Sequence, residues 1–573
     1  MGESDDDVSS TSTRNSLLQQ ERPLKTYNTL DVPGKQLNTE PLQSSSRTTS
    51  GYTQEDHTNE IGKLSLNVLT MCLCIGAALP SLDISIVYTT MTQIGSEFQS
   101  AHLSNWIHSA YTLCTLVTMA SAGGLSNVIG RKPVLVGLNV LFFIGSVGCA
   151  YARSFPQLVA SRIIAGIGGG GIALFGNIIL HDLVPSEKVG SYLSYLSTVQ
   201  TLGFGLGAPI GGFITDYFGW RYCFRINILP LILILYVYIF HLNNYSIDES
   251  QKAELTTKEK LQKVDFGGIF LVSIGNVSFT CALLLGGSYG WASPQIISAL
   301  IVAPIAYASF FLYERQWAKY PLLSRAAAND RNFTTSCVSV FLVGLCESGA
   351  LVLIPQFLMG VLHFSTSDAG AWIMIEAMAC PVGCFVAGRY MERTGRFARF
   401  TSVNILLYTL SMVMLYFWIG DRIPLSVGTF GIIVEGTTYG CFIVPMIVAC
   451  TSTLPKESAA TAMSMCLLAR SVGYLTGAAA VSAIIQYTLK TLLPQRINGD
   501  DAEQLIEFII TSIRKVSTLA PEIQQIVSDI MIEATQRATL IVVAFAFLAF
   551  LASLQYQNIN LLKKNDNTEE THG

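Results

Sequence analysis

Long apolar stretches alternate with short polar ones along most of the chain. A helix needs about 20 apolar residues to cross the ~30 Å hydrocarbon core of a bilayer, and roughly fourteen stretches reach that length. Backbone groups in lipid must be satisfied internally, so these stretches are expected to be helices rather than strands of a barrel. The predicted spans are residues 64–88, 105–125, 133–152, 156–180, 190–215, 223–241, 265–287, 292–314, 333–356, 369–391, 400–419, 425–451, 459–489 and 537–557.

Polar segments divide these spans into groups. Residues 1–62 are rich in Ser, Thr and acids and are expected to form a disordered cytoplasmic tail. Six spans follow over 63–241, then a charged cytoplasmic linker over 242–264, two extra spans with an inner loop over 265–332, and six spans over 333–557. The outer segment 490–536 carries apolar residues at helical spacing and is expected to form short helices at the membrane face, and 558–573 is a second cytoplasmic tail.

Composition excludes several classes of protein. Half of the residues are hydrophobic, 13% are charged and the mean hydropathy is +0.45, which no soluble domain matches. The chain has no Gly-x-x-x-x-Gly-Lys-Ser/Thr phosphate loop, and its thirteen cysteines show no metal-ligand spacing. We therefore expect no enzymatic activity, no cofactor, no metal site and no nucleic-acid partner.

A short basic turn between two apolar stretches occurs twice. Its first copy runs Gly-Gly-Leu-Ser-Asn-Val-Ile-Gly-Arg-Lys over residues 123–132, and a related copy runs Gly-Arg-Tyr-Met-Glu-Arg-Thr-Gly-Arg-Phe over residues 388–397. Glycines and an arginine stand at matching offsets in the two copies. Two halves built on one plan are typical of secondary transporters.

The distribution of cations predicts the orientation. With the N-terminus in the cytoplasm, sixteen Lys and Arg residues fall in the inner connections and three fall in the short outer loops. Positive residues are retained on the cytoplasmic side of a membrane, so we expect both chain ends and both basic turns to face the cytoplasm.

Charged residues inside the predicted spans are candidates for chemistry, because each costs about 2.5–3.5 kcal/mol at a helix centre on insertion scales. Four acids against two bases give a negative interior that suits a small cationic substrate, a proton, or both in alternation. An alternative is structural pairing of Asp83 with Arg162 or of Glu435 with Arg470. The set is Asp83, Arg162, Glu347, Glu376, Glu435 and Arg470.

Several motifs, taken in chain order, resemble those of the major facilitator superfamily, in particular its fungal fourteen-span drug:proton antiporters. The resemblance covers residues 64 to 557 and implies two pseudo-symmetric six-helix bundles with two extra central spans, acting as a monomer in the bilayer. The matching positions are Gly123, Leu125, Gly130, Arg131 and Lys132 in the first basic turn, 82–87 in span 1, 162–168 in span 4, and Gly203, Gly207, Pro209, Gly211 and Gly212 in span 5.

The glycines and the proline also have a direct physical interpretation. The glycine run at 166–171 removes side chains from one length of helix, so that a neighbouring helix can approach closely. In span 5, Pro209 frees a backbone carbonyl, while Gly207, Gly211 and Gly212 let the helix bend or pack. A flexible gate and ordinary tight packing both fit this segment.

The first basic turn departs from the family pattern at its fifth position. The family has Asp there, thought to anchor the cytoplasmic gate, whereas this chain has Asn127, which loses a charge term of about 0.3–1 kcal/mol at a helix terminus. The second copy keeps an acid, Glu392, beside Arg393. We therefore expect the gate to depend more on the second copy.

Glu347 lies mid-span between Gly344 and Gly349, and a glutamate there resembles the fungal vacuolar basic amino-acid transporters. That resemblance implies a proton-coupled antiporter that moves Lys, Arg and His into the vacuole. A buried carboxylate holds protons more tightly than an exposed one and could exchange a proton for a cation. The alternatives are a plasma-membrane exporter of drugs or organic cations, a siderophore carrier, and a nutrient sensor with a transporter fold.

Overall fold

The computed structural model describes residues 65–100, 103–185, 187–244, 264–318, 325–364, 366–421, 424–497, 505–506, 509 and 520–560. The predicted tail over 1–62, most of the linker over 242–264, the middle of the segment 490–536 and nearly all of the tail over 558–573 lie outside these residues.

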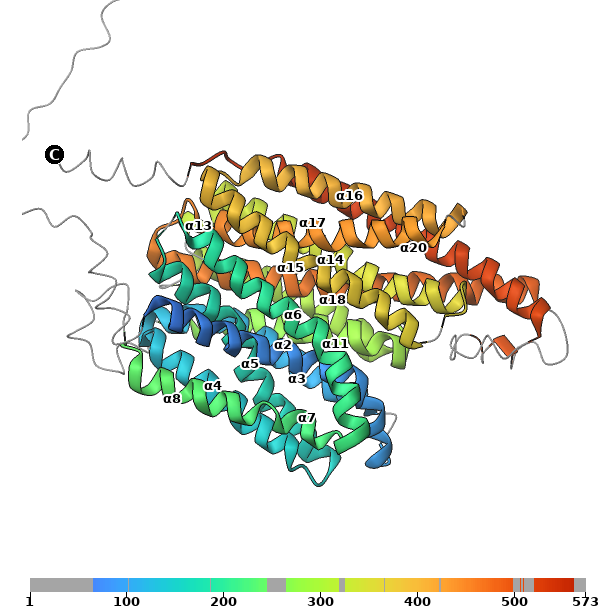
Figure 1. Cartoon of the computed structure of the whole chain (residues 1–573), viewed down its shortest axis with the longest axis horizontal. Helices are drawn as coiled ribbons and strands as arrows, with labels where there is room; N and C mark the ends of the chain where they lie inside the picture. The colour runs from blue at the N-terminus through green and yellow to red at the C-terminus, as the bar shows by residue number, and fades with distance from the viewer. Residues whose placement is uncertain are drawn as a thin grey trace, which may run out of the picture. The chain divides into compact units, whose positions relative to one another are not determined.

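The described chain is helical and contains no strand, which confirms the predicted all-helical class (Figure 1). In chain order the helices are α2 (Leu66–Glu97), α3 (Asn105–Ile129), α4 (Arg131–Ala150), α5 (Phe155–Leu183), α6 (Val189–Phe218), α7 (Arg221–Arg225), α8 (Ile228–His241), α11 (Phe266–Tyr289), α12 (Pro294–Gln316), α13 (Arg325–Asn329), α14 (Arg331–Gly360), α15 (Thr366–Thr394), α16 (Ala398–Asp421), α17 (Leu425–Thr451), α18 (Lys456–Arg496) and α20 (Pro521–Ser553).

Thirteen stretches of described helix are long and apolar enough to cross a membrane. Helix α6, with 30 residues, fills the place of the remaining predicted span, but its serines, threonines and glycines make it less apolar than the others. The span predicted at 223–241 consists of α7 and α8, joined by a short turn at Ile226 and Asn227. Helix α18 continues to Arg496 and α20 begins at Pro521, so helix occupies both ends of the segment 490–536.

Local sequence sets several helix ends. The Asp330 carboxylate accepts a hydrogen bond from the Phe333 amide at 2.8 Å, and Asp265 caps α11 in the same way through Gly268 at 2.9 Å. Such caps satisfy amides that have no partner inside the helix. Helices α3 and α6 end at Gly130 and Gly219, whose positive φ angles of 106° and 87° favour glycine.

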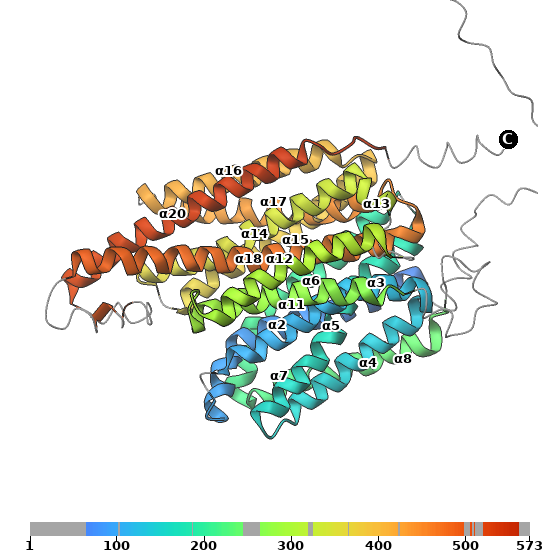
Figure 2. The same ribbon diagram turned by 180° about the vertical axis from the view of Figure 1, so that it is seen from behind.

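The helices form two groups, α2–α8 and α14–α20 (Figures 1 and 2). The first is held by contacts of α2 with α6 and of α5 with α3 and α4, and the second by contacts of α14 with α18, of α15 with α17, and of α20 with α14 and α16. Two seams, α6 against α15 and α3 against α18, join the groups. The hairpin α11–α12 lies at the second seam, where α11 contacts both α3 and α18.

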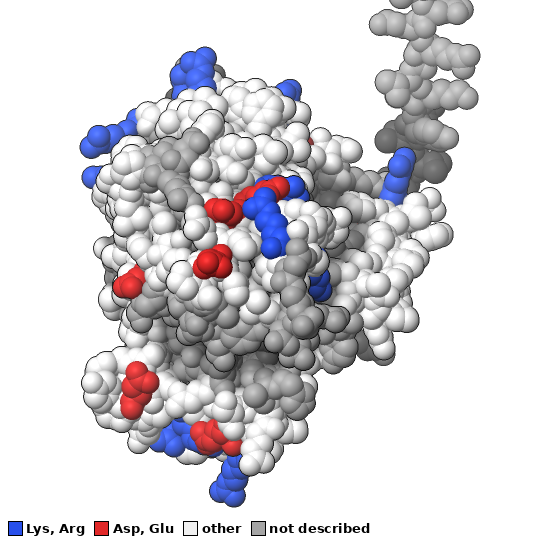
Figure 3. All heavy atoms as spheres, turned by 90° about the vertical axis from the view of Figure 1, so that its right-hand side faces the viewer, with Lys and Arg blue, Asp and Glu red and all other residues white. Residues whose placement is uncertain are grey.

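Both basic turns lie at one end of the helices, the end that begins α4 and finishes α15, which we call the motif end. The opposite end is seen in Figure 3, where charged side chains are scattered over a mostly uncharged surface.

Glycines set how closely the helices pack in the second group. A Cβ added at Gly383 would overlap the Thr437 carbonyl, and one at Gly440 would overlap the Cys380 carbonyl, so α15 and α17 meet backbone to backbone. The same holds for α14 and α18 at Gly473, whose added Cβ would overlap the Phe341 carbonyl. Small residues are what permit such an approach between membrane helices.

The glycines of α5 and α6 have the same role in the first group. Added Cβ atoms at Gly203, Gly207 and Gly211 would lie 2.8 Å from Ala78 O, 2.7 Å from Leu82 O and 3.1 Å from Ile86 Cα on α2. Helix α6 is continuous through Pro209. A Cβ added at Gly212 would meet no described atom within 4 Å. In this conformation three of the span 5 glycines therefore serve tight packing.

Gly440→Val is expected to destabilise the protein, because the new side chain would overlap the backbone of α15. Overpacking of this kind costs about 1–3 kcal/mol, and a backbone obstacle cannot move aside as a side chain can. The unfolding midpoint of the purified protein in detergent, followed by a thiol-reactive dye, should fall. Gly137→Val is the matched control, since nothing lies within 4 Å of its added Cβ; equal midpoints for the two variants would contradict the prediction.

Candidate functional site

Three glutamates from three helices meet inside the second group. Glu347 of α14, Glu376 of α15 and Glu435 of α17 are 5%, 3% and 2% exposed. Each offers a carboxylate oxygen, and these oxygens all lie within 4.8 Å of one another. The sequence predicted each residue singly, and the structure brings them together. We call them the carboxylate cluster.

Close glycine contacts between helices position the carboxylate cluster. A Cβ added at Gly436, next to Glu435, would lie 2.5 Å from the Glu376 carbonyl oxygen, so α15 and α17 meet backbone to backbone where their acids stand. On α14, Gly344 lies against the Arg470 backbone of α18, at 2.8 Å from added Cβ to carbonyl oxygen, and Glu347 follows about one helical turn later.

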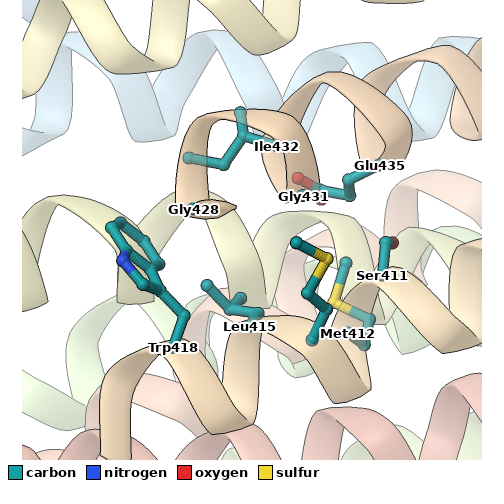
Figure 4. A pocket seen from close by; sticks show the side chains of 9 residues that line it. Ser411, Met412, Leu415, Trp418, Gly428, Gly431, Ile432 and Glu435 are labelled. Atoms are coloured by element: carbon teal, nitrogen blue, oxygen red, sulfur yellow. The ribbon is translucent and has the colours of Figure 1, made fainter. Parts of the chain in front are cut away.

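Few polar groups support these acids. The Tyr408 hydroxyl donates a hydrogen bond to Glu347 Oε2 at 3.4 Å. Glu376 Oε2 and Glu435 Oε1 are buried and have no hydrogen-bond partner within the described part of the chain. A small cavity between α16 and α17 reaches Glu435 past Ser411, Met412 and Trp418 (Figure 4).

Charge repulsion dictates what the carboxylate cluster can hold. Three negative charges this close repel one another strongly when water is excluded. No ion pair of the described residues supplies a compensating cation to any of the three. The cluster therefore suits a shared proton, an ammonium or guanidinium group, or a metal cation that prefers oxygen ligands.

Asp83 and Arg162 form a buried ion pair in the first group. Arg162 Nη1 donates to Asp83 Oδ2 at 2.5 Å, and Arg162 Nε donates to the Ile107 carbonyl oxygen at 3.1 Å. The guanidinium also stands 4.2 Å from the centre of the Tyr111 ring. Of the two interpretations of Asp83, the structure shows the paired one.

Other polar residues surround this ion pair. Asn227 Nδ2 donates to Asp83 Oδ1 at 3.4 Å, from the turn between α7 and α8. Next along the group, His108 Nε2 and the Tyr88 hydroxyl are hydrogen-bonded at 3.1 Å. Tyr88 could not be singled out from the sequence, because it is one of many tyrosines in apolar stretches.

Arg470 does not pair with Glu435. The ion pairs of the described residues do not include Arg470, although its helix lies beside the carboxylate cluster. The second structural pairing considered from the sequence is therefore wrong, because Glu435 faces Glu347 and Glu376 instead. Tyr439, one turn beyond Glu435 on α17, lies within electrostatic reach of both Glu347 and Arg470.

At the motif end, the first basic turn holds itself together and touches the other group. Arg131 donates to Asp182 Oδ2 at 2.9 Å, to Asn127 Oδ1 at 2.8 Å, and to Ser126 Oγ. Asn127 Nδ2 in turn donates to Thr461 Oγ1 of α18 at 3.5 Å. Asp182 was missed from the sequence, because it lies 51 residues from Arg131 with no local signal.

The remaining positions of the first turn are structural. A Cβ added at Gly123 would lie 2.7 Å from the Ala460 carbonyl oxygen, which brings α3 directly onto α18. Lys132 Nζ donates to the Ile239 carbonyl oxygen at 2.9 Å near the end of α8. Gly130 supplies the positive φ angle that ends α3.

The second basic turn also reaches across. Ser191 Oγ of α6 donates to Glu392 Oε2 at 2.6 Å, and Arg389 Nη1 donates to the same oxygen at 3.0 Å. The expected neighbour of the acid was Arg393, but Arg393 is exposed, and one helical turn places Arg389 on the side of Glu392 instead. Both turns therefore join the two groups at the motif end.

Comparisons with known proteins agree with this architecture. Residues 73–478 match the family described as the Major Facilitator Superfamily. The chain is 28% identical over 507 residues to the vacuolar membrane amino acid uptake transporter fnx2 of Schizosaccharomyces pombe, covering 88% of this chain and 86% of the relative. It is 27% identical over 505 residues to multidrug resistance protein fnx1 of the same organism, covering 87% and 94%. It is 27% identical over 484 residues to vacuolar basic amino acid transporter 2 of Saccharomyces cerevisiae, covering 80% and 98%.

Among solved structures, the proton:xylose symporter XylE bound to 6-bromo-6-deoxy-D-glucose superposes with a TM-score of 0.56 at 14% identity, covering 87% of this chain and 98% of that one. A likeness at this identity shows a shared fold. Since the family match covers more than half of the residues and the helices follow the same fold, the chain belongs to the major facilitator superfamily.

Proposed function

We propose that this transporter is an antiporter that exchanges protons for basic amino acids at the carboxylate cluster. The observation that carries the proposal is the meeting of Glu347, Glu376 and Glu435 within 4.8 Å, with no ion-pair partner for them among the described residues. Such a site must hold a cation or protons when it is closed, and lysine, arginine and protonated histidine each present a cation on a side chain.

Mutual exclusion would couple the two ions. A protonated cluster lacks the charge that attracts an ammonium or guanidinium group, and a cluster holding that cation has lost its excess negative charge. Each face of the membrane then loads whichever ion is abundant there, and the conformational change carries it across. Closure at the motif end, through Glu392 with Ser191 and Asn127 with Thr461, would represent the state closed to the cytoplasm.

Two relatives support the substrate and the compartment. One is named a vacuolar membrane amino acid uptake transporter and the other a vacuolar basic amino acid transporter. We accordingly place this protein in the vacuolar membrane as a monomer, with both termini in the cytoplasm and transport directed into the lumen. The cation distribution supports that orientation.

A second function has specific support. The relative named multidrug resistance protein is 27% identical over 505 residues, which favours export of organic cations across the plasma membrane as the alternative. A fluorescent tag at the vacuolar rim supports the first function, and one at the cell surface supports the second. Counterflow of labelled lysine in proteoliposomes separates both from a sensor that transports nothing.

Glu347→Gln is expected to abolish most ATP-dependent lysine uptake by vacuolar vesicles. The amide cannot carry the charge that holds either a proton or the substrate cation. Uptake in wild-type vesicles should also collapse when a protonophore removes the pH gradient.

Glu522→Gln is the control for this variant, because Glu522 is an exposed acid at the start of α20. Its uptake should match that of the wild type. Full lysine uptake by the Glu347→Gln vesicles would reject the role of the cluster.

Glu392→Gln is expected to impair transport more than Asn127→Ala. Glu392 accepts two hydrogen bonds as a charged group, and such bonds are worth about 1.5–3 kcal/mol against about 0.5–1.5 kcal/mol for neutral ones. The 3.5 Å contact from Asn127 to Thr461 is neutral and long. Initial rates of lysine uptake test the order of the two variants.

Arg399→Gln is the control beside the same turn, since its side chain is exposed and it lies outside residues 388–397, and it should transport normally. Equal or reversed losses in the two test variants would refute the unequal roles of the two turns.

A further inference from the structure

We infer that Arg470 forms a subsite for the substrate's α-carboxylate, so that the protein selects amino acids over amines that lack one. The inference rests on the proposed function and adds a second recognition point to it. The carboxylate cluster would take the cationic side chain, and Arg470 would take the opposite end of the same molecule.

Arg470 is a charged residue of a span that has no acidic partner among the described residues. An arginine keeps its charge in proteins, and placing it within a membrane span is costly without compensation. The side chain of Arg470 is half-buried in the middle of α18, and it takes part in none of the hydrogen bonds or ion pairs that the described residues form. Arg162, by contrast, is fully enclosed by Asp83 and Tyr111.

Arg470 also lies beside the carboxylate cluster. Gly344 packs on the Arg470 backbone, so α14 and α18 are in close contact one helical turn before Glu347. Tyr439 lies within electrostatic reach of both Glu347 and Arg470. A negative cluster and a positive group on neighbouring helices match the two ends of a basic amino acid.

This part of α18 faces the other group of helices. Ser471, the next residue, contacts Met119 Sδ of α3 at 3.8 Å. Tyr474, one turn further, lies within electrostatic reach of Tyr88 on α2, and Tyr88 is 44% exposed although it belongs to a span. Arg470 thus belongs to the seam at which the two groups must separate to admit a substrate.

The chemistry of a guanidinium gives the selectivity. Its planar N–H groups match a carboxylate with two parallel hydrogen bonds, which an amide or a methylene group cannot form. Cadaverine is lysine without its carboxylate, and lysinamide is lysine with that group made neutral. An organic-cation exporter would have no reason to distinguish these from lysine.

The test is counterflow of labelled lysine in proteoliposomes of the full chain, with unlabelled lysine, cadaverine and lysinamide as competitors. For the wild type we expect lysine to compete at least tenfold better than either amine. Arg470→Gln should reduce that advantage by about tenfold, and Arg470→Lys should leave an intermediate advantage. Lys490→Gln, which removes an exposed cation from the same helix, should keep the full advantage.

If Arg470→Gln is too slow for counterflow, the same three compounds are compared by how far they protect the purified variant from thermal unfolding. A full lysine advantage in Arg470→Gln, in either assay, would overturn the inference and leave the proposed function intact. A wild type that does not prefer lysine to cadaverine would do the same. A wild type that moves no basic amino acid would reject the proposed function and this subsite with it.

Discussion

Repulsion among three buried carboxylates is the constraint on which the chemistry of this transporter depends. At ~5 Å and an effective dielectric constant of 20, each charged pair repels by about 3 kcal/mol. The structure offers Glu347 one hydroxyl donor and leaves one oxygen each of Glu376 and Glu435 without a partner in the described residues. Under the proposed function, the carboxylate cluster closes only around something positive, which leaves when the site opens to the other side.

Close backbone contacts at glycines make this arrangement possible. Glu376 and Glu435 meet because Gly436 lets α17 lie on the backbone of α15, and Glu347 joins them because α14 lies on α18 at Gly344. A side chain at either glycine would push the helices apart where the acids stand. Packing and charge are thus opposed at this place, since the glycine contacts hold together carboxylates whose charges repel.

A feature can be predicted from the sequence when it depends on residues that are close together along the chain. Helices are predictable because a span of apolar residues is local, and the cost of charge in lipid singles out Glu347, Glu376 and Glu435 without any knowledge of the fold. Their meeting is not predictable from one sequence, because it depends on the rotation of three helices about their axes. For the same reason the sequence could not decide between pairing and no pairing for Asp83 with Arg162 or for Glu435 with Arg470, and among the described residues the first pair forms and the second does not.

Contacts between the two groups were the hardest to foresee. Ser191 and Glu392 are 201 residues apart, and a serine in a span gives no sign of its partner. The same applies to Thr461, which faces Asn127 from a distance of 334 residues. The basic turns themselves could be recognised as a repeated pattern, whereas the residues that form hydrogen bonds with them across the groups belong to no recognisable pattern.

The two groups of helices differ in how their intramembrane charges are neutralised. Helices α15 and α18 each connect such a charge to the motif end. In the first group the intramembrane acid is neutralised by an enclosed arginine, while in the second the acids and Arg470 form no ion pair with any described residue. Helix α15 carries both Glu376 and Glu392, sixteen residues or about 24 Å apart along one helix, and α18 carries both Arg470 and Thr461. A shift of α15 or α18 that accommodates a cation is also a shift at the motif end, where the same helices hold the two groups together. Under the proposed function, occupancy of the cluster would be linked to closure of the motif end through these two helices, with no need for a relay of side chains between them.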